Sequence, residues 1–444
     1  MDTRLRISWK GLCVAAAIAI AAPATASAAT DPLLADQWAL ADPAMIGAQE
    51  AWTQSNGSGV IVAVLDTGVQ LDHPDLAGSI WTNPGEIAGN GIDDDHDGIV
   101  DDVHGANMFD GSANVDDDNG HGTHVAGIVA ARNGNGIGGS GIAPGATILP
   151  VKVLDANMAG TTDTLALGIR YAVDRGAKIL NVSVNADSPT TTVAAAVRYA
   201  GDHGAIVVAS AGNNARDIDA VPSYPASLPD PAVLGVAAES EDGLLWSGSN
   251  IGVTSVDLAA PGDHITSTAR GSSYQSRTGT SAAAPFVSGS LALLSAARPD
   301  LSTSNLRDAL LATTKRSGLL SSLLATGRLD VGAAMHRVLA GRVWRTAAAA
   351  APAAAGPSLS LRSKSRVRAG ARVAVRWSAS GAANVARWRV SLDGRVIATV
   401  RGGSASYSRR VSRAGRHTWR VVGFEADGVK VVSGKRAFRA LPRH

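Results

Sequence analysis

Three short motifs carry side chains that can do chemistry. They are Asp66 in 64–68, His121 in 119–127 and Ser281 in 279–285. The carboxylate ends an apolar run, the imidazole lies where a Gly-rich loop enters a helix-like run, and the hydroxyl precedes an Ala-rich run. Each motif alone has an ordinary interpretation, as a strand-end cap, a surface histidine or a helix N-cap. Their significance therefore depends on finding all three together.

A regular alternation of elements surrounds these motifs. Continuous apolar runs, typical of strands buried on both faces, cover 60–65, 148–153, 177–184 and 205–209. Helix-like runs cover 123–131, 162–175 and 193–203. This alternation predicts an α/β fold with a largely parallel sheet and flanking helices. In such folds, functional side chains gather at the carboxyl ends of the strands, where Asp66 is placed.

The C-terminal part of the chain has a different pattern. A segment of Ala with Pro and Gly, 346–357, is typical of a linker. Beyond it, 387–392 alternates with period two, and Asp393-Gly394 leads into the second strand-like run, 395–400. This pattern indicates a β-hairpin, and Asp427-Gly428 indicates another. We expect a small all-β sandwich over 358–444.

Composition and charge support two domains. The chain has 444 residues, 45% hydrophobic and 18% charged, which excludes a disordered chain and a multi-span membrane protein. Residues 345–444 hold 21 Lys+Arg against 3 Asp+Glu, a net charge of +18, whereas 1–344 carry −16. We therefore expect the two parts to have different surroundings or partners.

The N-terminus has the features of a secretory signal peptide. Basic residues precede a short apolar run at 11–22, and Ala26-Ser27-Ala28 fits a cleavage site. The alternative is an uncleaved anchor. Cleavage after Ala28 would remove Cys13, the single cysteine, so the exported chain would need another source of stability, such as bound metal.

Taken together and in this order, the three motifs resemble those of the subtilisin-like serine proteases, the subtilase family. The resemblance covers about residues 31–340. It implies that Asp66, His121 and Ser281 form a catalytic triad, with His121 as the base for Ser281 and Asp66 holding the imidazole. It also implies that Asn213, in 209–214, donates to the oxyanion, although an ordinary turn explains that motif too.

The resemblance also implies a substrate groove. Ser183, Val184 and Asn185 stand where the family usually has Ser-Leu-Gly, and Gly160 is expected in the facing edge strand. Asn185 in place of glycine predicts either a narrowed specificity pocket or a harmless local rearrangement. His124, one helical turn after His121, is interpreted as structural.

An acidic insertion between Asp66 and His121 suggests calcium. Its predicted ligands have EF-hand-like spacing, with His104 instead of Glu at the last position: Asp93, Asp95, Asp97, Ile99 and Asp101. The alternative is a solvated acidic loop. A second site resembling the family's calcium loop would use Asp75 and Asn135, with Asp31 as a further candidate. We interpret 116–118 as a solvated run rather than a ligand cluster.

These inferences predict a secreted, extracellular, Ca²⁺-stabilised serine endopeptidase acting on proteins or peptides. The predicted parts are a signal peptide at 1–28, a catalytic domain at 29–345, a linker at 346–357 and a basic β-sandwich at 358–444. Alternatives are a peptide ligase or acyl-transferase and a non-proteolytic binding protein. We expect the chain to lack the family's N-terminal pro-domain, because Asp31-Pro32 and Gln37-Trp38, which resemble the start of a mature catalytic domain, follow the predicted signal peptide almost at once. The basic domain is expected to bind an anionic surface or its own catalytic domain, or to be a soluble spacer.

Overall fold

The computed structural model describes residues 30–188, 191–317, 320–341, 358–380, 387–393, 395–401, 406–424 and 430–442. The chain forms two compact units, Met1–Trp344 and Arg345–His444. The predicted signal peptide at 1–28 and the linker at 346–357 lie outside the described residues, so those limits stay predictions.

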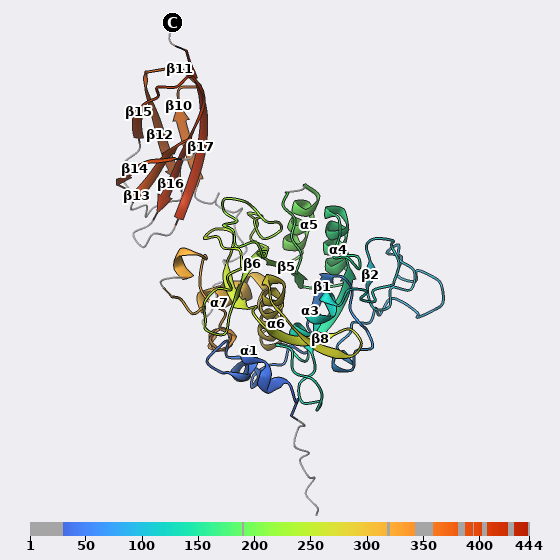
Figure 1. Cartoon of the computed structure of the whole chain (residues 1–444). Coiled ribbons are helices and arrows are strands. Elements are labelled where there is room, and N and C mark those ends of the chain that lie inside the picture. Colours follow the sequence, from blue (N-terminus) through green and yellow to red (C-terminus); the bar gives the residue numbers. More distant parts are fainter. Residues whose placement is uncertain are drawn as a thin grey trace, which may run out of the picture. The chain divides into compact units, whose positions relative to one another are not determined.

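Unit 1 is built on a parallel sheet in the order β2-β3-β1-β4-β5-β6-β7. Figure 1 labels its strands β1, β2, β5 and β6. Its strands are β1 (Ile61–Asp66), β2 (Ala106–Asn107), β3 (Thr147–Lys152), β4 (Ile179–Val182), β5 (Ile206–Ser210), β6 (Val233–Glu239) and β7 (Leu258–Pro261). Every neighbouring pair is parallel. The four predicted strands are β1, β3, β4 and β5, and the predicted fold class is confirmed.

Helices cover both faces of this sheet because alternate strand residues point to opposite sides. Val62 and Val64 of β1 pack with α3 (His121–Ala130) and α6 (Thr280–Ala297). Ala63 and Leu65 pack with α4 (Thr162–Asp174) and α5 (Thr191–Asp202) on the other face. The sheet is therefore apolar on both sides, which explains the unbroken apolar runs of the sequence.

The other α-helices of unit 1 and its antiparallel hairpin pack on the side of the sheet that α3 and α6 cover. They are α1 (Trp38–Ala41), α2 (Ala48–Trp52), α7 (Thr303–Ala312), α8 (Val331–Leu339) and the antiparallel hairpin β8 (Ile265–Ala269) with β9 (Ser273–Arg277). By length and composition α6 is apolar enough to cross a membrane, but 78% of it is buried in unit 1, where it is the central core helix.

Unit 2 contains a three-stranded sheet, β10-β12-β15, and a five-stranded sheet, β11-β17-β16-β13-β14. The strands are β10 (Ser358–Ser363), β11 (Arg366–Arg368), β12 (Arg372–Ser380), β13 (Arg387–Leu392), β14 (Arg395–Arg401), β15 (Ser406–Arg410), β16 (Gly415–Phe424) and β17 (Lys430–Leu441). A core that includes Trp377, Trp388 and Trp419 uses side chains of both sheets. The predicted all-β domain is confirmed.

Both predicted hairpins of unit 2 correspond to neighbouring antiparallel strands. β13 pairs with β14 across Asp393, and β16 pairs with β17, although Asp427-Gly428 lies outside the described residues.

Candidate active site

Asp66 and His121 come together at the carboxyl edge of the sheet. Asp66 is the last residue of β1, and His121 is the first residue of α3. His121 Nδ1 lies 2.7 Å from Asp66 Oδ1, which also accepts a hydrogen bond from the Thr67 amide. Asp66 is fully buried and its Oδ2 has no hydrogen-bond partner among the described residues. This pairing fixes the imidazole with its Nδ1 toward the carboxylate.

The electrostatic surroundings favour protonation of His121. Burial by itself lowers its pKa, but the charge and hydrogen bond of Asp66, with a contribution from Asp117, raise the pKa above 6.5. Arg277 acts in the opposite direction. His124 differs: burial lowers its pKa to about 3, and its Nε2 faces the carbonyl oxygens of Ile265 and Gln275. These contacts tie His124 to the β8–β9 hairpin.

Ser281 lies in the first turn of α6, next to the end of β4. Pro285 has no N–H to donate to the Ser281 carbonyl four residues earlier, and Ser183 Oγ donates to that carbonyl instead, at 3.0 Å. The Ser281 hydroxyl donates to the Ser183 carbonyl at 3.2 Å. In this conformation the Ser281 hydroxyl is therefore turned toward β4 rather than toward His121.

Asn213 follows β5 at the same edge. Its side-chain oxygen accepts hydrogen bonds from the amide and the hydroxyl of Thr280, both at 2.9 Å. Only the N–H groups of the Asn213 amide are then available to a ligand. The Ser281 N–H belongs to the first turn of a helix, where such groups lack intrahelical acceptors. The side-chain amide of Asn213 and the backbone N–H of Ser281 are therefore both candidate donors in the groove that these two residues line.

A groove of about 470 Å³ connects the predicted substrate residues with Ser281 and Asn213. Gly160, Ser183, Val184 and Asn185 all line it. The expected edge strand at Gly160 is wrong: Gly160 lies in the loop before α4, next to its N-cap Thr161. Asn185 is bound to β5, because its amide donates to the Ser210 carbonyl at 2.7 Å and its oxygen accepts from Ser210 Oγ at 3.1 Å.

Asp117 belongs to this site, although its place in an acidic run gives no sign of that. The solvated-run interpretation of 116–118 is wrong for Asp117, which is fully buried, whereas Asp116 and Asp118 are exposed. Its Oδ1 accepts from Thr67 Oγ1 and Gly120 N, and its Oδ2 accepts from the amide and hydroxyl of Thr123. Despite burial, these hydrogen bonds lower its pKa.

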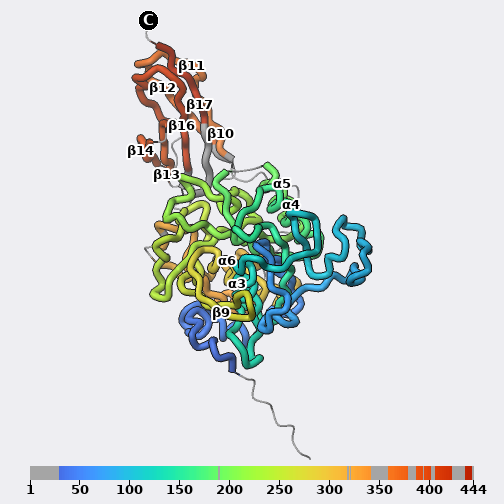
Figure 2. The backbone as a smooth tube through the Cα atoms, turned by 45° about the vertical axis from the view of Figure 1, so that its right-hand side comes forward, coloured from blue at the N-terminus to red at the C-terminus, as the bar shows by residue number. Residues whose placement is uncertain are grey.

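The acidic insertion, a light-blue segment in Figure 2, gathers three of its predicted ligands. Carboxylate oxygens of Asp93, Asp95 and Asp97 lie within 4.8 Å of one another. Asp101 is directed elsewhere and accepts from the amides of Gly89, Asn90 and Gly91, while the amide of Ile99 donates to Asp97. Arg175 pairs with Asp95 and, at 3.6 Å, with Asp97. A cation there would share these carboxylates with Arg175.

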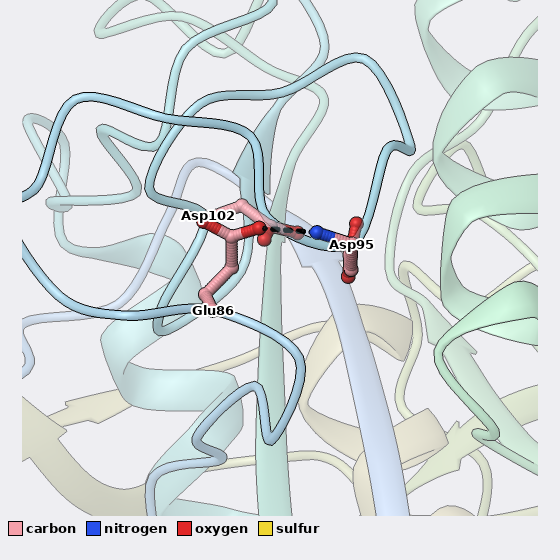
Figure 3. A group of neighbouring side chains, drawn as sticks. All are labelled: Glu86, Asp95 and Asp102. Atoms are coloured by element: carbon pink, nitrogen blue, oxygen red, sulfur yellow. Dashed lines mark hydrogen bonds between the residues drawn. The ribbon is translucent and has the colours of Figure 1, made fainter.

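A second acidic group, which the spacing of the Asp-rich run does not predict, adjoins the first. Glu86 and Asp102 bring carboxylate oxygens close to Asp95 (Figure 3). The Glu86 carboxylate accepts from the Asp95 amide, and the buried Asp102 accepts from Tyr171 and Asn83. Burial raises the pKa of Asp102 to about 6. Glu86 lies outside the run, so spacing gives no signal for it.

Asp75 and Asn135 also come together, as predicted. Asn135 Nδ2 donates to Asp75 Oδ1 at 2.8 Å, and the fully buried Asp75 leaves its Oδ2 without a hydrogen-bond partner among the described residues. Burial raises the pKa of Asp75 and outweighs the lowering effect of hydrogen bonding from Asn135, Gly139 and Tyr274, while the nearby Asp31 carboxylate raises the pKa further. Asp31 itself accepts from the amides of Gly134 and Gly136. An unpaired buried carboxylate oxygen beside a second carboxylate fits a calcium ion.

Unit 1 is thus an α/β structure with an Asp–His pair, a serine and an asparagine at one sheet edge. The model of the subtilase family matches residues 57–329, and the chain belongs to this family. It is a serine-type endopeptidase whose substrates are proteins or peptides. That assignment sets aside the alternative of a non-proteolytic binding protein.

Individual relatives cover the same region. Thermitase from Thermoactinomyces vulgaris is 38% identical over 288 residues, which are 65% of this chain and 92% of thermitase. Subtilisin Savinase from Lederbergia lenta is 36% identical over 278 residues, 63% of this chain and 91% of that protein. A solved protease structure from Pseudoalteromonas arctica PAMC 21717 has a TM-score of 0.59 at 29% identity and covers 70% of this chain and 100% of its own.

Proposed function

We propose that the endopeptidase works through a triad of Asp66, His121 and Ser281. The observation that carries this proposal is the 2.7 Å contact between His121 Nδ1 and Asp66 Oδ1, at the sheet edge where Ser281 lines the groove. With Nδ1 engaged by Asp66, His121 Nε2 is the nitrogen available to take a proton. Rotation of the Ser281 hydroxyl away from the Ser183 carbonyl would present it to that nitrogen.

In the acylation step, Ser281 Oγ bonds to the scissile carbonyl carbon and its proton moves to His121 Nε2. The carbonyl oxygen becomes an oxyanion, to which Asn213 Nδ2 and the Ser281 N–H donate. Collapse of this tetrahedral intermediate breaks the scissile C–N bond, and His121 returns the proton to the leaving amine. Water then attacks the acyl-enzyme ester, again with His121 as the base, which releases the carboxylic acid product and restores the Ser281 hydroxyl. Gly160, Ser183, Val184 and Asn185 are proposed to hold the peptide along the groove.

We further propose that calcium stabilises unit 1. The support at Asp75 is its unpaired, fully buried Oδ2, with Asn135 and Asp31 beside it. The side-chain amide of Asn135 would rotate so that its oxygen, and not its nitrogen, faces the calcium ion. In the insertion, the support is the hard-oxygen donor set of Asp93, Asp95 and Asp97. Bound calcium would offset the negative charge of these carboxylates and hold the loops that carry them together, without taking part in the chemical step.

Two assays test Ser281 as the nucleophile: covalent labelling by an active-site-directed fluorophosphonate, and degradation of casein as a protein substrate. The wild-type chain should become labelled and should degrade casein, whereas Ser281→Ala should do neither. The matched control is Ser276→Ala, an exposed serine five residues earlier. Labelling of the Ser281→Ala variant to the wild-type level would rule out Ser281 as the nucleophile. Transfer of the acyl group to added amines in preference to water would instead favour the ligase alternative.

Export with removal of residues 1–28 is part of the proposal. It rests on the basic start, the apolar run and Ala26-Ser27-Ala28. The intact mass of protein recovered from the culture medium should correspond to a chain that begins at Ala29. A cell-bound chain with the full N-terminus would contradict this and favour the uncleaved anchor. Binding of the basic domain to an anionic surface or to its own catalytic domain stays a prediction.

A further inference from the structure

The outer face of the five-stranded sheet in unit 2 is rich in arginine. Strand residues alternate between the core and the solvent, and Trp419, Val421, Phe438 and Ala440 are buried. Their neighbours on β16 and β17 therefore point outward, among them Arg416 and Arg439, which are exposed. The alternation that places apolar side chains in the core therefore also places these arginine side chains on the outer face of the sheet.

Three of these arginines are directly opposite one another. Arg439 of β17 pairs in register with Arg366 of β11 on one side and with Arg416 of β16 on the other. We call these three residues the arginine row. Because neighbouring strands lie about 4.7–4.9 Å apart, the row presents three positive charges within about 10 Å. Arg368, also exposed, extends the same edge of the sheet.

Nothing in the described part of unit 2 neutralises the arginine row. Its three side chains form no ion pair or hydrogen bond with any described residue. Asp393, the one described carboxylate of this unit, is engaged by His417 and the Thr418 amide. Like charges directly opposite one another destabilise a sheet. An external anion would relieve that repulsion.

The three-stranded sheet differs in this respect. It also places arginines opposite one another, Arg372 with Arg410 and Arg362 with Arg376. However, Arg372 donates to Ser408 Oγ at 3.4 Å and Arg410 to the Gly370 carbonyl at 3.3 Å. Part of this second arginine group thus has partners within the protein, whereas the arginine row has none among the described residues.

We propose that the arginine row is the docking surface for a linear anionic polysaccharide, with its sulfate or carboxylate groups bridging neighbouring guanidinium groups. Guanidinium binds such oxyanions through paired N–H donors. The three tryptophans of unit 2, Trp377, Trp388 and Trp419, are buried, so they offer no stacking platform to nucleic acid bases. A polymer without bases is therefore favoured. This inference does not depend on the peptidase mechanism.

The test uses the chain from residue 29 to residue 444 with Ser281→Ala, which prevents self-digestion, and heparin as the sulfated probe. The test variant combines Arg366→Gln, Arg416→Gln and Arg439→Gln. The matched control, with equal loss of charge, combines Arg362→Gln, Arg372→Gln and Arg376→Gln. The row variant should bind heparin at least about tenfold more weakly, and the slope of log Kd against log salt should fall by about one for each guanidinium–sulfate pair removed. The control should change Kd by less than about threefold.

Equal weakening by the two triple variants would overturn the proposal, because net charge alone would then explain binding. Absence of heparin binding by the parent chain would overturn it too. Tighter binding of single-stranded DNA than of heparin would assign the surface to nucleic acid instead. An unchanged or raised Tm of the row variant checks that the fold persists, and the single variant Arg439→Gln, at the centre of the row, provides a second measurement with the same expected direction.

Discussion

A second, fully buried carboxylate, that of Asp117, connects the segments that carry Asp66 and His121. Asp117 joins Thr67, which follows Asp66, to the backbone of the loop that carries His121. Thr67 Oγ1 in turn accepts from the Gly122 amide at 3.0 Å. The end of β1 and the start of α3 are thereby held together, so Asp117 acts as a positioning residue.

Removal of the proposed nucleophile, Ser281, or of the proposed base, His121, should nearly abolish activity. Ser281→Ala or His121→Ala should lower kcat by about a millionfold, by analogy with subtilisin, a relative for which such losses are known. Asn213→Ala should lower kcat by about 10²–10³-fold, since it removes one of the two proposed oxyanion donors, again by analogy with subtilisin. Steady-state assays with a chromogenic peptide measure both. A Ser281→Ala variant with wild-type kcat would contradict the triad.

The pH profile tests the charge environment of His121. In the proposed mechanism neutral His121 is the base, and its pKa is raised, so kcat/KM should fall as pH decreases through a value above 6.5. Asp117→Asn removes a charge that raises this pKa, so the fall of kcat/KM on the acid side of the profile (the acid limb) should shift to lower pH. The matched control, Asp116→Asn, alters an exposed carboxylate and should leave the limb in place. A uniform loss of activity without a shift would mean that Asp117 acts only through the fold.

At the scale of elements, the acidic insertion is attached to α4 by ionic and polar contacts. Arg175, the C-cap of α4, contacts Asp95 and Asp97, and Tyr171 donates to Asp102. Glu86 accepts from the amides of Asp94, Asp95 and Asp101, which closes the loop upon itself. Many carboxylates are thereby held close together, a repulsive arrangement that a divalent cation would relieve.

Calcium should therefore raise the stability of unit 1. Excess EGTA should lower the Tm and speed self-digestion, and added calcium should reverse both. A ligand at about 100 times its Kd stabilises the native state by about 2.7 kcal/mol. Asp75→Asn and Asp97→Asn should each reduce the calcium-dependent rise in Tm, whereas the exposed Asp116→Asn should preserve it. A melting curve that EGTA leaves unchanged, with metal loss confirmed, would argue against a stabilising site.

At the scale of the whole molecule, the two compact units have separate cores and opposite charge. Truncation after residue 345 removes the basic unit and should leave kcat/KM for a small peptide within about twofold, because every residue of the proposed site belongs to unit 1. Peptide assays and the Tm of the truncated chain measure this. Failure to fold, with rescue by residues 357–444 added in trans, would instead show that the basic unit assists folding.

The sequence alone determined the fold class and the residues that meet at the sheet edge. Unbroken apolar runs require burial on both faces, so β1, β3, α3 and α4 could be predicted from the sequence pattern. That Asp66 and His121 meet was implied by the resemblance of the three motifs to those of the subtilase family. The β-sandwich followed from period-two alternation in the same way. The absence of a strand at Gly160 could not be predicted, because a short segment gains strand structure only from a partner strand beside it.

The tertiary structure decided what depends on contacts between distant residues. Asp117 reads as part of an acidic run, yet hydrogen bonds from Thr67 and Thr123 make it a buried positioning residue. On β14, strict alternation would put Arg395 on the same face as Arg401, but the register shift between Val390 and Ser391 of β13 pairs Arg395 with Leu392. Likewise, Arg366, Arg416 and Arg439 are far apart in sequence, and only strand order and register bring their charges together.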